Sequence, residues 1–423
     1  MLPPDAIHPT VAEMLTDTLG MSPVATSALQ QLVDGFDDEL RQLQDQDLLR
    51  TPSTLQAIRG SEVQLDGRWL ANWCSNDYLG LSTHPRLIRA AMEAAQRWGV
   101  GARASRLLAG SAQLHEQLED ALASFFHAEA ALVFASGYLA NLGVLSSLMG
   151  PDDIVFVDRL AHASLIDACR ASRAMLRVFP HQDVTALEDS LQKRTRARRR
   201  FIVTEGLFSM DGDYAPLREF QDLAHRYEAC LYVDDAHGAF ALGVTGRGSP
   251  ERADIPHGAF LYIGTLGKAL GCQGGFVVGP RTLLRALQNR ARTFIYSTAL
   301  ACPIVAAAHE ALTLIQEEPA IRQRLANTTA RCQQLLRTTL GFTQDPPSHI
   351  VSIVLGSSGQ AREVSRHLYE RGHFIPAIRP PTVPQGTARL RMSLTALHTE
   401  KHLQDLMAAL QPYRNRIVRA VLT

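Results

Sequence analysis

The sequence predicts an α/β protein with a large domain and a smaller C-terminal α+β domain. Short apolar runs such as "DIVFVD" and "RFIVTEG" alternate with helical blocks such as "HEQLEDALASFF" in the middle of the chain. This alternation indicates a mostly parallel sheet whose strands are covered by helices on both faces. The chain has 423 residues, more than a typical single core, so a second and smaller domain is expected.

The composition is that of an ordinary globular protein. Hydrophobic residues make up 46% of the chain, charged residues 20%, and the formal net charge is zero. This balance predicts no nucleic-acid partner and no acidic membrane partner. The six cysteines form no CxxC pair, which argues against a metal site or a disulfide framework. Because the start, "MLPPDAIHPTVAEML", also lacks the pattern of a signal peptide, a cytoplasmic location is predicted.

Residues 1–75 are predicted to form an N-terminal extension. The first 25 residues or so lack strong periodicity and are expected to be loosely ordered. From Ser27 to Leu49, apolar residues recur at helical spacing with acids on the other face, which predicts an amphipathic helix. The stretch "EVQLDGRWLANW" then predicts a strand pair that turns at Asp66-Gly67.

Residues 76–311 are predicted to form the large domain and residues 312–423 the small one. Segment 130–150 of the large domain is uncharged over about the span of a bilayer. Its Ser, Asn and Gly residues divide it into a strand, a glycine turn and a helix, so no membrane span is predicted. The small domain is expected to contain a long helix, the strand "IVSIVLG", a second helix, the strand "TARLRMSLTA" and a terminal helix.

Unusual polar residues follow four of the predicted strands. In parallel α/β sheets, ligands bind at the carboxyl ends of the strands, so these residues are candidates for a site. They are Asp234, Asp235 and His237 after "CLYV", Thr265 and Lys268 after "LYIG", Glu205 and Ser209 after "FIVT", and Ser136 and Gly137 after "ALVF".

Lys268 is the strongest of these candidates. The chain has three lysines against thirty-nine arginines, so a solvated cation here would be expected to be arginine. Small and apolar residues surround Lys268 in "GTLGKALG", and burial lowers the pKa of an amine and frees it as a nucleophile. The alternative is a surface lysine at a loop tip. Since arginine cannot form a Schiff base at neutral pH, the sequence predicts that Lys268 binds a cofactor aldehyde.

The neighbouring strand ends suit pyridoxal 5'-phosphate (PLP). This cofactor needs a carboxylate that keeps its ring nitrogen protonated, and Asp234 is the candidate. Ser136 and Gly137 open a helix whose free N–H groups suit a phosphate. Plainer alternatives remain: a helix cap or turn for Asp234 or Asp235, an ordinary helix start, and a satisfied polar residue for His237. Taken together, the amine, the carboxylate and the phosphate cradle favour PLP.

Several motifs resemble those of the α-oxoamine synthases, a PLP-dependent family. They are "SGYLAN", "DRLAHASLIDA", "VTEGLFSMDGDYAPL", "VDDAHGAFALGVTGRG", "GTLGKALG" and "IRPPTVPQGTARLRMSLTALH". The resemblance covers about residues 48 to 410. The stretch "IRPPTVPQGTARLR", supported by "DDAH", is most similar to the members of this family that act in biotin synthesis.

The resemblance implies the PLP-dependent transferase fold type I and gives each site residue a role. Lys268 would bind the cofactor and later remove the substrate α-proton, Asp234 would pair with the ring nitrogen, and His162 would stack on the ring. These three and His237 are the expected catalytic residues. Ser209 and His237 would contact the phenolic oxygen of the cofactor. The phosphate would be held by Ser136, Gly137, Tyr138 and Thr265. Thr298 would contact the phosphate bound by a neighbouring subunit, which implies a homodimer.

The same resemblance implies a substrate site. Arg379 would clamp the amino-acid carboxylate with its bidentate fork, Asn76 and Thr382 would lie nearby, and Arg50 would face the acyl substrate. Asn76 and Ser209 could instead be turn residues, and Arg50 a surface charge.

Two further arginines, Arg389 and Arg391, alternate along a predicted strand. They are either contacts to an anionic substrate or a solvated strand face. The loop "GVGARASRLLAGS" departs from the family's glycine- and serine-rich pattern at Ala102, Ala104 and Ala109, which leaves the acyl specificity open.

The implied reaction condenses L-alanine with the thioester of pimeloyl-CoA or a pimeloyl carrier protein. It releases carbon dioxide and the free thiol and yields 8-amino-7-oxononanoate. One alternative keeps this chemistry with glycine or serine and a different acyl thioester. A remote alternative is a catalytically silent scaffold, whose sequence would be expected to lack Lys268 or Asp234.

Overall fold

The computed structural model describes residues 23–193, 196–256 and 258–417. The chain divides into two compact units, Met1–Ser53 and Thr54–Thr423. The first contains helix α2 (Pro23–Asp45), which confirms the predicted amphipathic helix with an earlier start and end. The helix stops before Asp47, which adopts a left-handed conformation with φ 59°. The loosely ordered segment predicted before it falls almost entirely outside the described residues.

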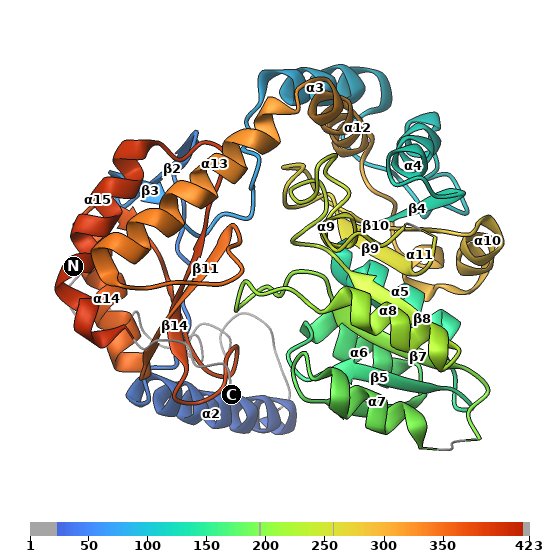
Figure 1. Ribbon diagram of the computed structural model, residues 1–423, viewed down its shortest axis with the longest axis horizontal. Helices are drawn as coiled ribbons and strands as arrows, with labels where there is room; N and C mark the ends of the chain where they lie inside the picture. The colour runs from blue at the N-terminus through green and yellow to red at the C-terminus, as the bar shows by residue number, and fades with distance from the viewer. Residues whose placement is uncertain (1–22, 194–195, 257, 418–423) are drawn as a thin grey trace. The chain divides into compact units, whose positions relative to one another are not determined.

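The second unit is built on a seven-stranded sheet, in the order β4-β10-β9-β8-β7-β5-β6. Strand β10 pairs antiparallel with both neighbours, and the other pairs are parallel. The predicted mostly parallel sheet is therefore confirmed (Figure 1). The strands are β4 (Ala130–Phe134), β5 (Ile154–Asp158), β6 (Met175–Phe179), β7 (Arg200–Glu205), β8 (Ala229–Asp234), β9 (Leu261–Thr265) and β10 (Gly275–Gly279).

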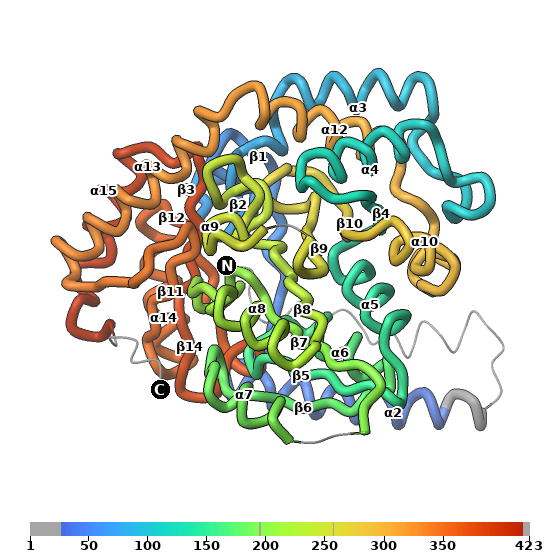
Figure 2. The backbone as a smooth tube through the Cα atoms, turned by 45° about the vertical axis from the view of Figure 1, so that its right-hand side comes forward, coloured from blue at the N-terminus to red at the C-terminus, as the bar shows by residue number. Residues whose placement is uncertain are grey.

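Helices cover both faces of this sheet, because successive strand residues point into two separate cores. In β8, Tyr232 belongs to one core and Leu231 and Val233 to the other. Helices α5, α6 and α10 contribute to the Tyr232 core, and α4, α7, α8 and α12 to the other. Figure 2 shows α3 running alongside α12. The helices are α3 (Pro85–Trp98), α4 (Gln113–Phe125), α5 (Gly137–Leu148), α6 (Ala163–Ala171), α7 (Val184–Gln192), α8 (Leu217–Arg226), α9 (Ser249–Arg252), α10 (Arg281–Arg290), α11 (Arg292–Ile295) and α12 (Cys302–Glu317).

Two small sheets accompany the large one. The predicted strand pair is present as β2 and β3, joined at Asp66 and Gly67, whose positive φ angles of 49° and 73° suit a tight hairpin. Strand β12, near the other end of the chain, pairs in parallel with β3. The hairpin, which was predicted within residues 1–75, thus shares a sheet with a C-terminal strand. This sheet contains β1 (Ala57–Arg59), β2 (Glu62–Leu65), β3 (Arg68–Asn72) and β12 (His373–Phe374).

The second small sheet is antiparallel and has the order β11-β14-β13. Its two long strands are those predicted from "IVSIVLG" and "TARLRMSLTA". Its strands and the remaining helical elements are β11 (Ile350–Gly356), β13 (Ala377–Ile378), β14 (Ala388–Ser393), α13 (Ala320–Leu335), η1 (Leu336–Leu340), α14 (Ser358–Glu370), α15 (Glu400–Leu410) and η2 (Gln411–Arg416).

The uncharged segment 130–150 folds as β4, a turn and α5, as predicted. No helix within the described ranges is both long and apolar enough to cross a membrane. The predicted boundaries at residues 76 and 312 stay predictions.

Phe276 is a test of the packing beneath the sheet. Its ring is fully buried and lies 5.3 Å from that of Phe126 and 5.6 Å from that of Phe240, centroid to centroid. Phe276→Ala leaves a cavity among these rings, so we expect the free energy of unfolding to fall by about 3–5 kcal/mol in urea denaturation. The matched control is Val244→Ala at a side chain that is 90% exposed, where we expect a change within about 0.5 kcal/mol. Equal effects of the two would contradict this assignment of the core.

Candidate active site

A cavity of about 190 Å³ opens at the carboxyl ends of β7, β8 and β9 and at the start of α5. This is the edge of the sheet at which the sequence predicts a ligand site. Seven residues with a predicted role line it, together with four that have none, among them the strand-end candidate Glu205. The lining residues are Gly137, Tyr138, Asn141, His162, Ser164, Glu205, Asp234, Ala236, His237, Thr265 and Lys268.

Lys268 lies on the turn after β9, with its amine inside the cavity. Its Nζ is 2.7 Å from His237 Nε2. Burial lowers the pKa of Lys268 to about 8, against the opposing pull of the Asp234 and Glu205 carboxyl groups. A minor but usable fraction of the amine is therefore neutral at pH 7, as a nucleophile requires. The alternative of a surface lysine at a loop tip is wrong.

A chain of hydrogen bonds leads from Lys268 to Asn76, one of the predicted substrate residues. His237 Nδ1 is 2.5 Å from the Tyr78 hydroxyl, which in turn donates to Asn76 Oδ1 at 3.2 Å. Burial and the Lys268 charge hold the pKa of His237 well below its ordinary value. A neutral imidazole between an amine and a hydroxyl can take a proton on one nitrogen and give one from the other. The chain therefore offers a route for protons to and from Lys268.

Asp234 faces the cavity, whereas its neighbour Asp235 does not. Asn141 donates to Asp234 Oδ2 at 2.6 Å, and Tyr232 donates to the carbonyl of the same amide at 2.8 Å, which fixes its orientation. Asp235 accepts from the Ser249 backbone and hydroxyl and from the hydroxyl of Tyr262. The Asp235 side chain is thus occupied by these contacts, whereas Asp234 remains an acceptor for a protonated ring nitrogen.

The start of α5 lies at the cavity, where the sequence predicts a phosphate cradle. Ser136 caps the helix by accepting from the N–H of Leu139 at 3.2 Å, and the first-turn N–H groups of Gly137 and Tyr138 have no partner within the helix. A Cβ on Gly275 would lie 2.6 Å from the Gly137 nitrogen, so β10 can pass this close only as glycine. The Thr265 hydroxyl donates to Gly274 O at 2.7 Å. Such an N-terminus suits a phosphate group.

His162 caps the next helix, α6. Its Nδ1 lies 2.8 Å from the Ser164 hydroxyl, and burial lowers its pKa. The ring is therefore neutral and lines the cavity as a flat surface. A primary amine, an acceptor carboxylate, a flat neutral ring and a helix N-terminus together fit a pyridine aldehyde that carries a phosphate.

Glu205 is a cavity residue that the sequence marked at a strand end but assigned no role. It is 3% exposed, and its Oε1 has no hydrogen-bond partner among the described residues. Burial and the nearby Asp234 charge raise its pKa to about 8, so it is mostly protonated at pH 7 and can donate a hydrogen bond. Asn141 was missed as well; its position one helical turn after Gly137 in "SGYLAN" was the available signal.

Ser209 and Thr298 lie outside the cavity lining. Ser209 follows β7, and its N–H donates to Glu205 Oε2 at 3.3 Å. Thr298 lines a separate small pocket with Arg106 and forms a β-bridge with Ser105. Within one chain the structure does not bring Thr298 into the cavity.

The remaining predicted substrate residues are distributed over other segments. Arg379 and Thr382 share one turn after β13, where the Thr382 N–H donates to Arg379 O at 3.1 Å. Arg50 belongs to the first unit, after α2. Their predicted roles stay predictions, as do the individual cofactor contacts. Among the described residues, no group of three His, Cys, Asp or Glu side chains could hold a metal ion.

Arg389 and Arg391 are buried, with 4% and 7% exposure, so their interpretation as a solvated strand face is wrong. Arg389 forms an ion pair with Asp211. Arg391 donates to Ser209 O at 2.5 Å and to Asn76 Oδ1 at 3.3 Å. Arg391 therefore connects the small antiparallel sheet with Ser209, on the loop after β7, and with Asn76.

Comparisons with known proteins agree with this geometry. The family model for class I and II aminotransferases matches residues 69–410. The 8-amino-7-oxononanoate synthase of Geobacter sulfurreducens is 46% identical over 374 residues, which cover 88% of this chain and 96% of that protein. The protein of the same name from Herminiimonas arsenicoxydans is 47% identical over 378 residues, with 88% and 97% covered. The chain belongs to the aminotransferase class I and II family.

Solved structures show that the fold is similar as well. A serine palmitoyltransferase variant from S. paucimobilis, with a bound PLP–myriocin aldimine, has a TM-score of 0.86 and 30% identity, covering 92% of this chain and 99% of that one. An 8-amino-7-oxononanoate synthase from Francisella tularensis has a TM-score of 0.71 and 28% identity, with 82% and 98% covered. The predicted fold type I and the resemblance of this aminotransferase-family chain to the α-oxoamine synthases are confirmed.

The electrostatic balance at Lys268 can be tested in the apo-protein. Because the Asp234 carboxylate raises the pKa of Lys268, Asp234→Asn should lower that pKa further below 8. We would follow the side-chain signals of ¹³C-lysine-labelled protein by NMR during a pH titration. Lys401, whose side chain is 80% exposed and paired with Asp405, is the internal control, and its signals should be the same in both proteins. An unchanged or raised pKa of Lys268 would contradict the assignment.

Proposed function

We propose that this chain catalyses the PLP-dependent condensation of L-alanine with a pimeloyl thioester, giving 8-amino-7-oxononanoate, carbon dioxide and free thiol. Relatives such as the Geobacter protein are named for this reaction, which is a step of biotin synthesis. The observation that carries the proposal is Lys268, an amine with a lowered pKa in a cavity that Asp234, His162 and the start of α5 complete.

Some residues would hold the cofactor and the substrate, and others would transfer protons. When bound, PLP supplies an electron sink for the carbanion that forms at the α-carbon of the amino acid. Lys268 would remove the α-proton, and His237 and Tyr78 would relay protons to and from its amine. Asp234 would keep the nitrogen of the cofactor ring protonated. The positive charge on this nitrogen would stabilise the negative charge that develops at the α-carbon, and such electrostatic stabilisation is usually the largest catalytic effect. Arg379 would hold the amino-acid carboxylate by its guanidinium fork.

A second candidate keeps this chemistry and changes the substrates. The likeness to serine palmitoyltransferase at a TM-score of 0.86 favours it, as do the alanines in the loop 99–111, which departs from the family pattern. In this case serine or glycine would replace alanine, with a different acyl thioester. The two candidates differ in the amino acid that supports turnover.

Product identification decides between them. We expect the holoenzyme to form a product with the mass of 8-amino-7-oxononanoate from L-alanine and pimeloyl-CoA, and to prefer alanine over glycine and serine. Borohydride reduction followed by peptide mapping should locate the cofactor on Lys268. Lys268→Ala should lose the label and all but a trace of turnover, because no other lysine lines the cavity. A clear preference for glycine or serine would reject the biotin assignment, and a label elsewhere would reject the site.

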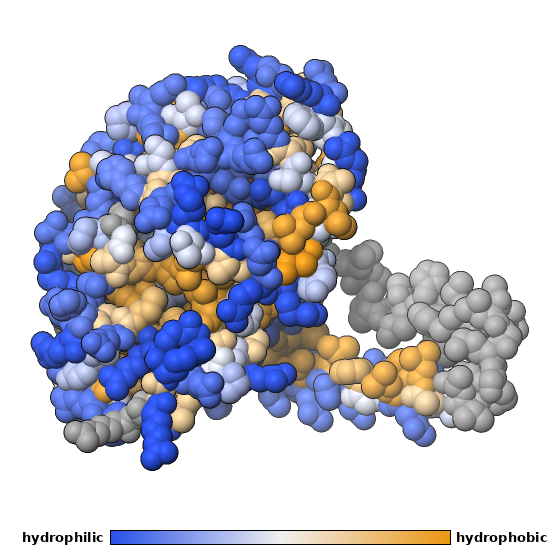
Figure 3. Space-filling model, turned by 90° about the vertical axis from the view of Figure 1, so that its right-hand side faces the viewer, coloured by the Kyte–Doolittle hydropathy of each residue, from blue (hydrophilic) through white to orange (hydrophobic). Residues whose placement is uncertain are grey.

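The proposed enzyme acts as a homodimer in the cytoplasm. Thr298 is held to the loop 99–111 by its bridge to Ser105 and by the Ala299 N–H, which donates to Ala104 O at 3.1 Å. Apolar side chains stand exposed around this region, with Leu108 81% and Tyr296 71% exposed. Figure 3 shows apolar patches on the side of the molecule that lies at the right in Figure 1. A second copy that covers this region would bury the exposed apolar side chains, and it would receive Thr298 at its phosphate site.

The cytoplasmic location is supported by the cysteines. All six cysteines are free thiols, which suits a reducing compartment.

A subunit-mixing experiment tests the shared site. Thr298→Asp would place a carboxylate beside the partner's phosphate site, and Lys268→Ala removes the nucleophile, so we expect each homodimer to be inactive. A mixed dimer would keep one intact site, and a one-to-one mixture should recover about a quarter of the wild-type activity. The control mixes each variant with itself. An inactive mixture of verified mixed dimers, or a fully active Thr298→Asp protein, would contradict the shared site.

A further inference from the structure

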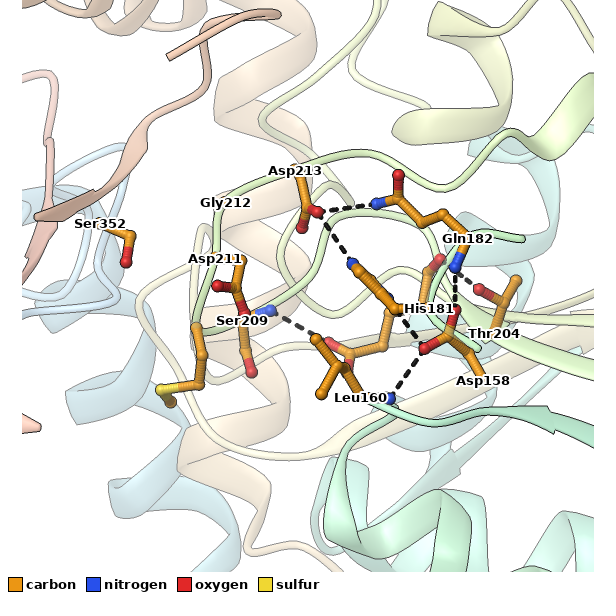
Figure 4. Close-up of polar contacts among 12 residues, drawn as sticks. Asp158, Leu160, His181, Gln182, Thr204, Ser209, Asp211, Gly212, Asp213 and Ser352 are labelled. Atoms are coloured by element: carbon orange, nitrogen blue, oxygen red, sulfur yellow. Dashed lines mark hydrogen bonds and ion pairs between the residues drawn. The ribbon is translucent and has the colours of Figure 1, made fainter. Parts of the chain in front are cut away.

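His181 lies between two acidic side chains from different segments. Its Nδ1 is 2.9 Å from Asp158 Oδ1 and its Nε2 is 2.9 Å from Asp213 Oδ2 (Figure 4). Its ring packs edge-on against that of Phe208. The side chain of Asp158 is fully buried, and those of His181 and Asp213 are 10% and 14% exposed. Gln182 supports both acids: its N–H donates to Asp158 and its amide to Asp213, each at 2.8 Å.

This arrangement requires a protonated imidazole. A neutral histidine donates from one nitrogen only, whereas both nitrogens of His181 face carboxylate oxygens, which can only accept when ionised. Asp158 and Asp213 are the charged groups that face the ring, and they raise the pKa of His181 to about 9 in spite of its burial. His181 is thus a cation at neutral pH that joins two anions.

Each of the two acids holds a segment that carries a site residue. Asp158 ends β5 and accepts from the Leu160 N–H at 2.8 Å, which fixes the turn leading to His162. Asp213 lies in the loop 206–215 that carries Ser209, and its backbone O accepts from the Phe208 N–H at 2.9 Å.

The far side of this loop is held by the small antiparallel sheet. Arg389 pairs with Asp211, and Arg391 donates to Ser209 O at 2.5 Å. Gly212 O accepts from Ser348 at 2.6 Å. His181 therefore contacts the loop from the large-sheet side, together with Gln182.

We propose that His181 is a positioning residue: by joining Asp158 to Asp213, it sets the loop of Ser209 against the turn of His162 and so shapes the cofactor site. The assignment rests on the proposed function and on the contacts that the family resemblance implies for both residues, His162 with the ring of PLP and Ser209 with its phenolic oxygen. Without His181, two carboxylates would face each other across the space it leaves, and their repulsion would move the loop.

The test compares wild-type protein with His181→Asn in the apo and PLP-loaded forms. We expect faster amide hydrogen exchange in residues 206–215, weaker PLP binding by about 10-fold, and a kcat about 10- to 100-fold lower, since misplacement of this size has such effects. The pKa of His181 is raised from 6.5 to about 9, so its stabilising effect is complete below pH 6.5 and is lost as pH rises through 9. The difference in Tm between the two proteins should therefore shrink above pH 9.

Two further variants separate positioning from general destabilisation. His181→Asn/Asp213→Asn removes the repulsion and should bind PLP more tightly than His181→Asn alone. His402→Ala removes a cap at the start of α15 and should lower Tm without changing PLP affinity or exchange in residues 206–215. If His181→Asn does not fold, Asp213→Asn cuts the same link and should show the same changes to a smaller extent.

Unchanged exchange and PLP affinity, or the same changes in His402→Ala, would overturn the proposal. These readouts do not depend on which substrate is turned over. If the wild-type enzyme makes no 8-amino-7-oxononanoate, the proposed function fails, whereas exchange in residues 206–215 and PLP affinity still decide the role of His181.

Discussion

The burial of one amine beside two carboxyl groups is the constraint on which the site depends. Removing a charge from water is costly unless opposite charges or hydrogen bonds compensate for it. At Lys268 the compensation is partial: burial lowers its pKa to about 8 although Asp234 and Glu205 act in the opposite direction. The same burial raises the pKa of Glu205 to about 8. Near neutral pH the cavity therefore holds an amine that can lose its proton and an acid that can supply one.

The site depends on two sheets of the second unit, the large sheet and the small antiparallel sheet. The strand ends of the large sheet carry Lys268 and Asp234, whereas Arg391 extends from β14 of the small antiparallel sheet to Ser209 O and Asn76. A buried arginine is tolerated because its donors find acceptors, including the Ser393 hydroxyl at 2.9 Å. Since one guanidinium contacts both the loop beside the cavity and a proposed substrate residue, a shift of the small sheet would move both together.

The sequence predicts those features whose signal is local. Continuous apolar runs identify the buried strands, and polar residues directly after them identify Asp234, His237 and Lys268. Edge strand β6 was not predicted, because Met175 and Val178 are 46% and 55% exposed and form no continuous buried run. The parallel pairing of β12 with β3 joins segments some 300 residues apart, and no short pattern encodes such a contact. The role of Arg391 was left open for the same reason, since its partners come from distant segments.

The histidines show how charge is distributed around the cavity. Burial and the charges of Lys268 and Arg391 lower the pKa of His237 and bring that of His349 to about 3, so the rings beside the amine are neutral. His181 is further from the amine and faces two carboxylates, and its pKa is raised instead. A second cation beside Lys268 would lower its pKa further and would repel a protonated ring nitrogen. Between Asp158 and Asp213, by contrast, the positive charge of His181 compensates for the charges of two acids that would otherwise repel each other, so that both can hold their segments at one point.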